Sequence, residues 1–128
     1  MRLVPFIAVD GLPFALSPAQ LHLRFGPPLR QERTPVGLNE HDYGDRVFRF
    51  QDSGRLEEVT QRVPTLFVGE AAIPFAALAA FIRAHDAEAF ERARFLVSPR
   101  YGVAFVPDQP DWLTALAAHC IDTWRELR

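Results

Sequence analysis

The amino-acid sequence predicts a single α+β domain with a mainly antiparallel sheet and three helices. Two patterns predict this class: stretches of alternating apolar residues bounded by tight-turn residues, and three segments in which apolar residues recur at helical spacing. Strands mixed with helices in this way indicate an α+β arrangement. The length agrees, because 128 residues that are 48% hydrophobic suit one domain with its own core. We therefore treat residues 1–128 as one domain.

The N-terminal segment and the helix after it come first. We interpret the short apolar run over residues 1–10 as a strand. Ser17 has the position of an N-cap, a proline follows it, and Gln20 is placed to close a capping box. Gly26 and the two prolines after it cannot continue a helix. These signals predict a helix near residues 18–25.

Three further strands are predicted in the first half of the chain. They cover residues 29–34, 43–50 and 55–61. A polar loop is expected over residues 35–42, and an Asp-Ser-Gly turn at 52–54 separates the last two strands. Because Leu56 and Val59 do not alternate cleanly, we expect a bulge or a twist in the last strand.

The second half continues with two more helices and three short strands. One helix is predicted to begin near Pro74 and to break at Asp86. The strands are predicted at 65–68, 95–97 and 103–106. Asp111 is interpreted as the cap of the last helix, whose stripe is wide enough to dock on a sheet. This stripe comprises Trp112, Leu113, Leu116, Cys120, Trp124 and Leu127.

A faint internal repeat relates residues 11–61 to residues 72–128. The tetrapeptide Leu-Pro-Phe-Ala at 12–15 resembles Ile-Pro-Phe-Ala at 73–76, and a Tyr-Gly pair precedes a strand in each copy. Each copy would hold a helix that begins at Pro-Phe and is followed by a hairpin. Two such units would form one continuous sheet with the helices against one face and the other face free.

Charge and cysteine content narrow the functional classes. The net charge of −2 argues against a general nucleic-acid binder or a binder of acidic membranes, either of which would show a basic excess. All 14 basic residues are arginine, and this composition carries no functional signal by itself. One cysteine, Cys120, excludes an internal disulfide framework and a multi-cysteine zinc site. The N-terminal apolar run is broken by Pro5 and ended by Asp10, too short for a signal peptide or a membrane span. We expect a cytoplasmic protein.

Catalytic signals are weak. The four histidines, at 22, 41, 85 and 119, have no metal-ligand spacing, and no phosphate-binding glycine pattern occurs, so we expect no metal and no cofactor. His41, Asp42 and Tyr43 are the one dense polar cluster that suits general-base chemistry, although neighbouring strand residues point to opposite faces. His119 and Cys120 are neighbours on a predicted helix, so they are poorly placed as a base and a nucleophile. Burial is the favoured interpretation of Cys120.

Acidic residues gather in the predicted central hairpin and are the candidate partner-binding residues. They are Glu40, Asp42, Asp45, Asp52, Glu57 and Glu58. A solvated sheet face is the plain structural interpretation, and an acidic docking surface for a basic protein is the functional one. Arg46, Arg49 and Arg55 are expected to pair with these acids, because a guanidinium suits planar pairing with a carboxylate.

Several of these segments together resemble a known class of proteins. They are the Pro-Phe pair at 13–14, the helix that ends at Gly26-Pro27-Pro28, the strand at 43–50 and its turn at 52–54. This layout resembles small bacterial α+β proteins of the toxin-immunity type, and the helix-plus-hairpin repeat is similar to the β-lactamase-inhibitor-protein-like architecture. The resemblance implies a non-enzymatic protein that binds and neutralises a cognate toxin. It transfers no catalytic residue.

Three functional hypotheses follow. The first is a cytoplasmic immunity protein or inhibitor that binds a cognate toxin or another protein. The alternative is a small enzyme or ligand-binding protein that uses His41, Asp42 and Tyr43 at a cleft. The third is a homodimer formed through a sheet edge or through Trp112 and Trp124.

Overall fold

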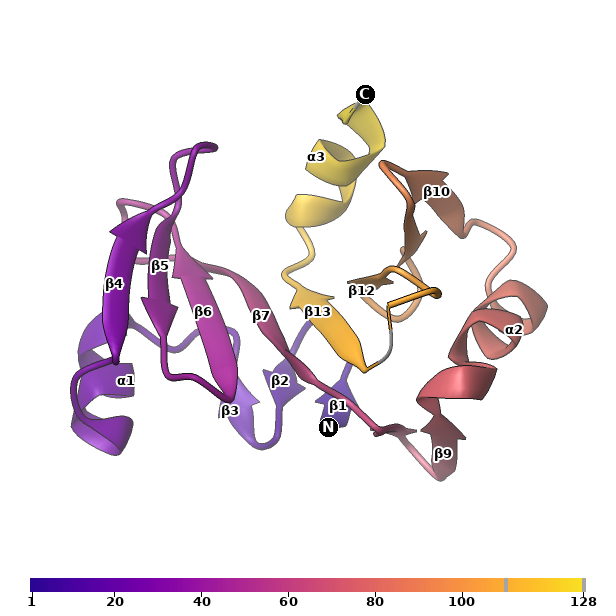
Figure 1. Cartoon of the computed structure of the whole chain (residues 1–128), viewed down its shortest axis with the longest axis horizontal. Coiled ribbons are helices and arrows are strands. Elements are labelled where there is room, and N and C mark those ends of the chain that lie inside the picture. Colours follow the sequence, from indigo (N-terminus) through magenta and orange to yellow (C-terminus); the bar gives the residue numbers. More distant parts are fainter. Residues whose placement is uncertain (110, 128) are drawn as a thin grey trace.

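The computed structural model describes residues 1–109 and 111–127. Within these residues the chain forms one α+β domain with two sheets and three helices (Figure 1). The helices are α1 (Pro18–Phe25), α2 (Phe75–His85) and α3 (Cys120–Glu126). The predicted fold class is therefore confirmed.

The larger sheet joins the two halves of the chain. In chain order its strands are β4 (Arg30–Arg33), β5 (Asn39–Asp42), β6 (Arg46–Phe50), β7 (Leu56–Arg62), β10 (Phe90–Arg92), β11 (Phe95–Ser98), β12 (Val103–Phe105) and β13 (Trp112–Leu116). They lie side by side in the order β10-β11-β12-β13-β7-β6-β5-β4, and every neighbouring pair is antiparallel. The β7–β13 pair, with Thr60 opposite Thr114, connects the halves.

The smaller sheet is built from the two segments that precede α1 and α2. Its strands are β1 (Arg2–Val4), β2 (Ala8–Val9), β3 (Leu12–Pro13), β8 (Thr65–Val68) and β9 (Ala71–Pro74), in the order β3-β2-β1-β8-β9. Here β1 and β8 are parallel, whereas the other pairs are antiparallel. The predicted single strand over residues 1–10 is thus two strands that form a hairpin.

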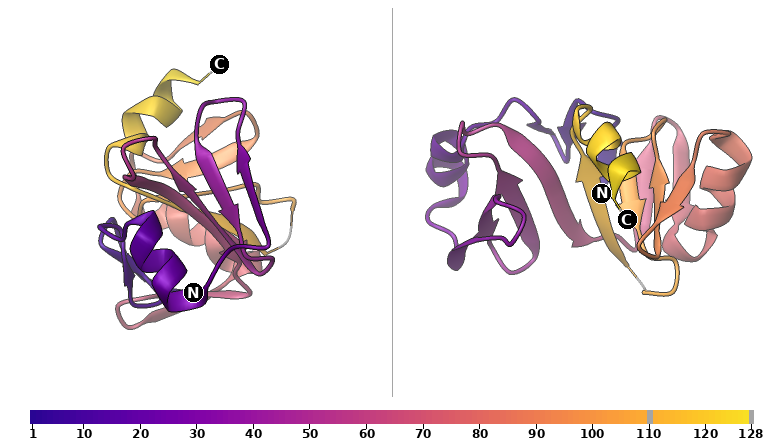
Figure 2. Two further views of the ribbon diagram at one scale, coloured as in Figure 1. Left: turned by 90° about the vertical axis from the view of Figure 1, so that its left-hand side faces the viewer. Right: turned by 90° about the horizontal axis from the view of Figure 1, so that it is seen from above.

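Both halves pass through the same order of elements. A short strand with a Pro-Phe boundary leads into a helix, and four antiparallel strands follow: β3, α1 and β4–β7 in one half, β9, α2 and β10–β13 in the other. The predicted repeats 11–61 and 72–128 would each hold one hairpin after the helix, whereas four strands follow each of the two helices in the larger sheet; the repeat itself stays a prediction. The helices α1 and α2 lie at opposite ends of the molecule (Figure 2).

The main core lies against one face of the larger sheet, which we call the inner face. Large side chains from this face, such as Phe48 and Phe105, pack with Leu21 of α1, Leu66 of β8 and Leu78 of α2, all at most 1% exposed. Each buried side chain of this size stabilises the fold by about 1.5–3 kcal/mol. The helices α1 and α2 and the smaller sheet therefore cover the inner face.

The local signals of the first two helices are confirmed. The Ser17 hydroxyl accepts a hydrogen bond from the Gln20 amide (3.1 Å), and the Gln20 side chain accepts one from the Ser17 amide (2.9 Å). Gly26 caps the other end of α1 at a φ of 77°, which favours glycine. The second helix ends at His85 with Asp86 as its C-cap.

The prediction of one helix after Asp111 is wrong over its first part. Residues 112–116 form β13, and only Cys120–Glu126 are helical. β13 lies between β12 and β7, so Leu113 is buried on the inner face and Leu116 on the opposite face. A strand that is buried on both faces loses its alternation, and its apolar residues then also fit a helical stripe.

The predicted loop over residues 35–42 is also wrong in part, because residues 39–42 form β5. This strand pairs with β4 and β6 over its whole length. It escaped prediction because its side chains are polar or charged, and Glu40 and Asp42 find arginine partners on the neighbouring strands instead of entering a core. The predicted strands at 29–34, 55–61, 95–97 and 103–106 are confirmed, with small shifts at their ends.

Candidate functional site

A cleft lies on the outer face of the larger sheet, opposite the main core. Helix α3 packs on this face over β11–β13, where Ile121 joins Val97, Ala104 and Leu116 in a second, smaller core. Among the described residues, no helix lies over the outer face of β4–β6 (Figure 1). Two adjoining cavities of about 290 and 270 Å³ run along α3 and share Trp124. We call them together the Arg49 cleft.

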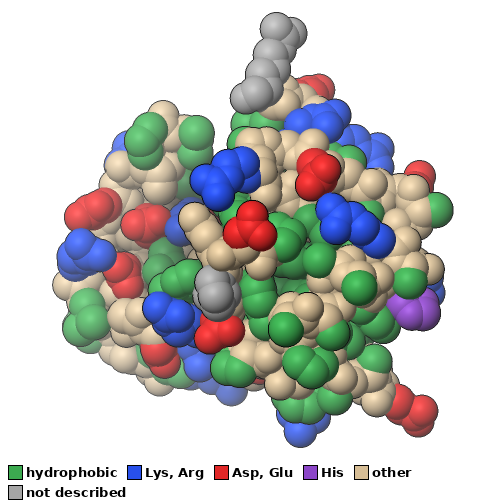
Figure 3. Space-filling view, turned by 45° about the vertical axis from the view of Figure 1, so that its right-hand side comes forward, with side chains coloured by type: hydrophobic (Ala, Val, Ile, Leu, Met, Phe, Trp, Pro, Cys, Tyr) green, Lys and Arg blue, Asp and Glu red, His purple; other side chains and the backbone are tan. Residues whose placement is uncertain are grey.

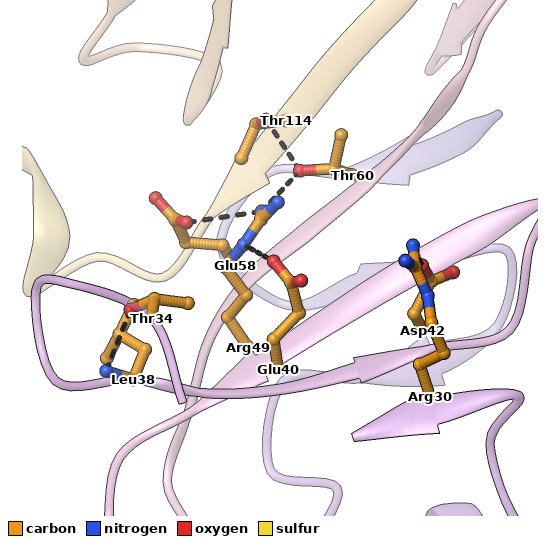
Figure 4. A network of polar contacts seen from close by, with 9 residues as sticks. All are labelled: Arg30, Thr34, Leu38, Glu40, Asp42, Arg49, Glu58, Thr60 and Thr114. Carbon is orange, nitrogen blue, oxygen red and sulfur yellow. Dashed lines mark hydrogen bonds and ion pairs between the residues drawn. The ribbon is translucent and has the colours of Figure 1, made fainter. Parts of the chain in front are cut away.

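The floor of the cleft is formed by Arg49, Thr60 and Thr114, which belong to a row of paired polar side chains (Figure 4). The Arg49 guanidinium on β6 donates to Glu40 on β5 (2.9 Å) and lies 3.4 Å from a carboxylate oxygen of Glu58 on β7. It also donates to the Thr60 hydroxyl (2.7 Å), which lies 2.7 Å from the Thr114 hydroxyl on β13. These residues occupy outward positions on adjacent strands, so the network crosses the sheet from β5 to β13.

The pairing leaves little free charge on this floor. The side chains of Glu58 and Arg49 are 16% and 22% exposed. Burial raises the pKa of Glu58, and the nearby Arg49 guanidinium lowers it in opposition. This largely buried carboxylate depends on its arginine partner, because loss of either partner would leave the other unpaired.

The predicted irregularity in the last central strand is confirmed, and it positions Glu57. The register between β6 and β7 shifts so that Arg49 faces Glu58 while Phe50 faces Leu56, which leaves Glu57 as the extra residue. Its side chain is 4% exposed, and its Oε1 atom lies 3.3 Å from the Arg55 guanidinium. The bulge thus places a buried carboxylate in the wall of the cleft.

His119 and Cys120 both contact this carboxylate. His119 is the N-cap of α3 and Cys120 is its first residue. The His119 Nε2 atom and the Cys120 Sγ atom each contact Oε2 of Glu57, and the sulfur lies 2.9 Å away. Within the described residues, these three form the group whose potential ligand atoms all lie within 4.8 Å of one another. The two residues were expected to be poorly placed as a base and a nucleophile, and in the structure both instead contact one carboxylate.

The thiol of Cys120 is not poised as a nucleophile. Burial, together with the hydrogen bond and negative charge of Glu57, raises the pKa of Cys120 well above its ordinary value. A nucleophilic cysteine needs a lowered pKa, because the thiolate is the reactive form. The cysteine is 8% exposed, as its predicted burial requires.

The six predicted partner-binding acids differ in how closely they pair with arginine side chains. Glu40 and Glu58 lie with Arg49, and Glu57 with Arg55, which confirms the expected pairing. The other three acids line neither cavity of the cleft. Asp42 pairs with Arg30 (2.7 Å), Asp52 pairs with Arg33 (2.6 Å), and Asp45 is 77% exposed with Arg46 at 4.0 Å.

These ion pairs leave Asp45 as the most exposed of the six acids. The Arg30 guanidinium lowers the pKa of Asp42, and the Arg33 guanidinium lowers that of Asp52. On the side of the molecule that carries α2, acidic and basic side chains are likewise interspersed with apolar ones (Figure 3). The acidic docking surface stays a prediction, with less net charge than the sequence count indicates.

The cluster of His41, Asp42 and Tyr43 does not converge. His41 is buried on the inner face, with its Nδ1 atom 3.1 Å from Nε2 of His22. Asp42 points to the outer face toward Arg30, and the Tyr43 hydroxyl donates to the Gly26 carbonyl (2.9 Å). Strand alternation separates the first two side chains, as the sequence predicts.

Sequence reasoning missed the site formed by Glu57, His119 and Cys120, since Glu57 lies 62 residues before His119. The irregular pattern around Leu56 was the one local signal near it. None of the described helices has the length and apolar character needed to cross a membrane. Comparison with protein-family models, curated proteins and solved structures found no match to this chain.

Proposed function

We propose that the chain is a non-enzymatic protein that binds a cognate bacterial protein toxin and neutralises it in the cytoplasm. The Arg49 cleft and the hairpin formed by β4 and β5 would be the binding surface. The observation that carries the proposal is the unequal cover of the larger sheet. Helix α3 covers the outer face of β11–β13, whereas no helix in the described part of the chain covers the outer face of β4–β6.

The composition of the cleft suits a protein partner. Trp124 separates its two cavities, and Trp112 at its far end is 37% exposed. Tryptophan and arginine are enriched at the energetic centres of protein interfaces. Arg49 is already held by Glu40 and Glu58, so a partner would meet an ordered surface rather than one that must first be fixed.

The hairpin of β4 and β5 adds an ordered projection beside the cleft (Figures 1 and 2). At its tip, the Thr34 and Leu38 backbones are joined by a hydrogen bond of 2.8 Å, and the Thr34 hydroxyl accepts from the Leu38 amide (3.0 Å). Gly37 adopts a φ of 84°, which this tight turn requires. The turn presents Val36, which is 79% exposed, for contact with a partner.

The resemblance to toxin-immunity proteins is the reason for proposing a toxin, rather than another protein, as the partner. The enzyme hypothesis has less support, because His41, Asp42 and Tyr43 point to different places. A homodimer through the β4 edge is also disfavoured, because that strand reads Arg-Gln-Glu-Arg and charged edges discourage strand pairing. The mass of the chain in solution tests the homodimer directly.

The test uses the purified chain and the toxic domain encoded by the gene next to its own. We expect direct binding and protection of cells that produce the toxin. Val36→Asp should weaken binding by about tenfold or more, since a charge would enter an apolar contact. The matched control is Leu23→Asp, because Leu23 is 90% exposed on α1, away from the cleft.

Two outcomes would overturn the proposal. One is an absence of both binding and protection. The other is an unchanged affinity of the Val36→Asp protein alongside a loss of affinity in the Leu23→Asp protein, which would move the interface to α1.

A further inference from the structure

We propose that Glu57, His119 and Cys120 bind one divalent transition-metal ion of the zinc type, in the wall of the Arg49 cleft. The three residues supply a carboxylate oxygen, an imidazole nitrogen and a sulfur. They come from the bulge in β7 and from the start of α3, which the fold brings together. This inference is independent of the identity of the protein partner.

The spacing of the three atoms suits a common ion. Zinc ligands lie about 2.0–2.3 Å from the metal, so tetrahedral ligands lie about 3.3–3.6 Å from one another. The three atoms all lie within 4.8 Å of one another, and the sulfur lies 2.9 Å from Oε2 of Glu57. Small side-chain rotations would therefore place them around one ion, without a change in the backbone.

The donor set selects the class of metal. Magnesium and calcium prefer oxygen ligands alone, whereas sulfur and imidazole nitrogen suit zinc and its transition-metal neighbours. A carboxylate and a deprotonated thiol together carry two negative charges, which a divalent ion balances in this largely buried position. Glu57 and Cys120 are 3% and 8% exposed.

The surroundings would hold the carboxylate and leave room for a fourth ligand. Arg55 lies 3.3 Å from Oε1 of Glu57, so Oε2 faces His119 and Cys120. The Ala117 amide donates to the Glu57 carbonyl (2.9 Å), and the Cys120 amide donates to the Ala117 carbonyl (3.0 Å). Such outer contacts orient metal ligands. The three residues also line a cavity of about 290 Å³ that has room for a water molecule.

The test is a titration of the chelator-treated full chain with Co²⁺ under a phosphine reductant. We expect one bound Co²⁺ per chain, a near-ultraviolet absorption band from thiolate coordination, and displacement of the Co²⁺ by Zn²⁺. Cys120→Ser should remove the near-ultraviolet band and weaken binding by about tenfold or more, and His119→Asn should weaken binding similarly. The matched control is His85→Asn, because His85 lies exposed at the end of α2.

Far-ultraviolet circular dichroism verifies that each variant is folded. Failure of the folded wild-type chain to bind either Co²⁺ or Zn²⁺ at micromolar concentration would overturn the proposal. So would a Cys120→Ser protein that keeps the near-ultraviolet band, or a loss of binding in the His85→Asn protein. Because the titration contains no toxin, its failure is distinguishable from a failure of the proposed toxin binding.

Discussion

The two halves of the larger sheet share an order of elements but differ on their outer faces. In the N-terminal half, the outward positions of β5–β7 carry Glu40, Arg49 and Glu58, which pair with one another. In the C-terminal half, the outward positions of β11–β13 include Val97 and Leu116, both 0% exposed. An apolar sheet face must be buried, so α3 follows β13 and covers it, whereas a charge-paired face stays stable in water.

The proposed binding site lies at the border between the two halves of the larger sheet. The paired floor of β5–β7 continues through Thr60 to Thr114 on β13, and there α3 begins to rise over the sheet. The Arg49 cleft follows this border, and the buried Glu57 lies in its wall. The Arg49 cleft therefore lies where α3 covers the outer face of one half and leaves that of the other half open.

The largest expected loss of stability is for a substitution in the C-terminal half, whose outer face is covered by α3. Leu116→Ala should lower the free energy of unfolding by about 3 kcal/mol, because it leaves a cavity beneath α3. Val47→Ala, on the same face of the open half, should cost less than about 1 kcal/mol, since Val47 is only partly buried. Urea denaturation measures both values. Equal losses would contradict the difference between the halves.

The charge-paired floor predicts a smaller loss in the open half. Arg49→Met should lower the free energy of unfolding by about 2 kcal/mol, because Glu40 and Glu58 lose their partner while water reaches them only in part. A second substitution, Glu58→Gln, should recover part of this loss. A double-mutant cycle with no coupling between Arg49 and Glu58 would contradict the pairing.

The halves should also differ in their response to acid. Burial and the neighbouring His22 lower the pKa of His41, so the folded state favours the neutral imidazole. Stability from this source is present above the ordinary pKa of about 6.5 and falls as the pH drops below it, by at most about 1.4 kcal/mol per pH unit. Urea denaturation between pH 7 and pH 5 should show this slope, and His41→Phe should remove it.

In the C-terminal half, an acid-induced loss of stability is expected from Asp86, at a lower pH than the loss from His41. Burial alone would raise the pKa of Asp86, but hydrogen bonds from Ser98 and from the Arg100 and Glu88 amides together lower it. Stability from Asp86 is therefore present above the ordinary pKa of about 3.9 and is lost as the pH falls below it. Asp86→Asn should change the pH dependence of stability only below about pH 4. A change between pH 7 and pH 5 would contradict this assignment.

The smallest effect on stability is expected at the exposed margin of the open half. Asp45→Lys should change the free energy of unfolding by less than about 0.5 kcal/mol, since the side chain is 77% exposed. If the toxin is basic there, the same change should slow association, most clearly at low salt. Asp45 is a cleaner probe than Glu57 or Glu58, because reversal of a buried charge would also disturb the fold.

Helix ends could be predicted from the sequence, because they depend on residues that are close together along the chain. The capping box at Ser17 and Gln20 and the end of α2 at Asp86 are examples. The polar strand β5 and the doubly buried strand β13 could not be assigned in this way. Their side-chain patterns are explained by the neighbouring strands, which are β4 and β6 for β5, and β7 and β12 for β13.

The site was less predictable than the fold. The sequence indicated that Arg49 and Arg55 would pair with nearby acids, and both do. It gave no sign that Glu57 would meet His119 and Cys120, because that meeting depends on a bulge and on the β7–β13 pairing of distant segments. The expectation of no metal rested on the spacing of histidines along the chain. Such spacing gives no information on contacts between residues that are far apart in the sequence.

Hydrogen–deuterium exchange of the chain, free and bound to its toxin, tests the central claim most directly. We expect toxin binding to slow exchange at the tip of the β4–β5 hairpin, along β5 and β6 and in α3, and to leave exchange in α1 and α2 unchanged. Slowing confined to α1 and α2, with the residues of the Arg49 cleft unaffected, would contradict the claim that the uncovered outer face is the binding surface.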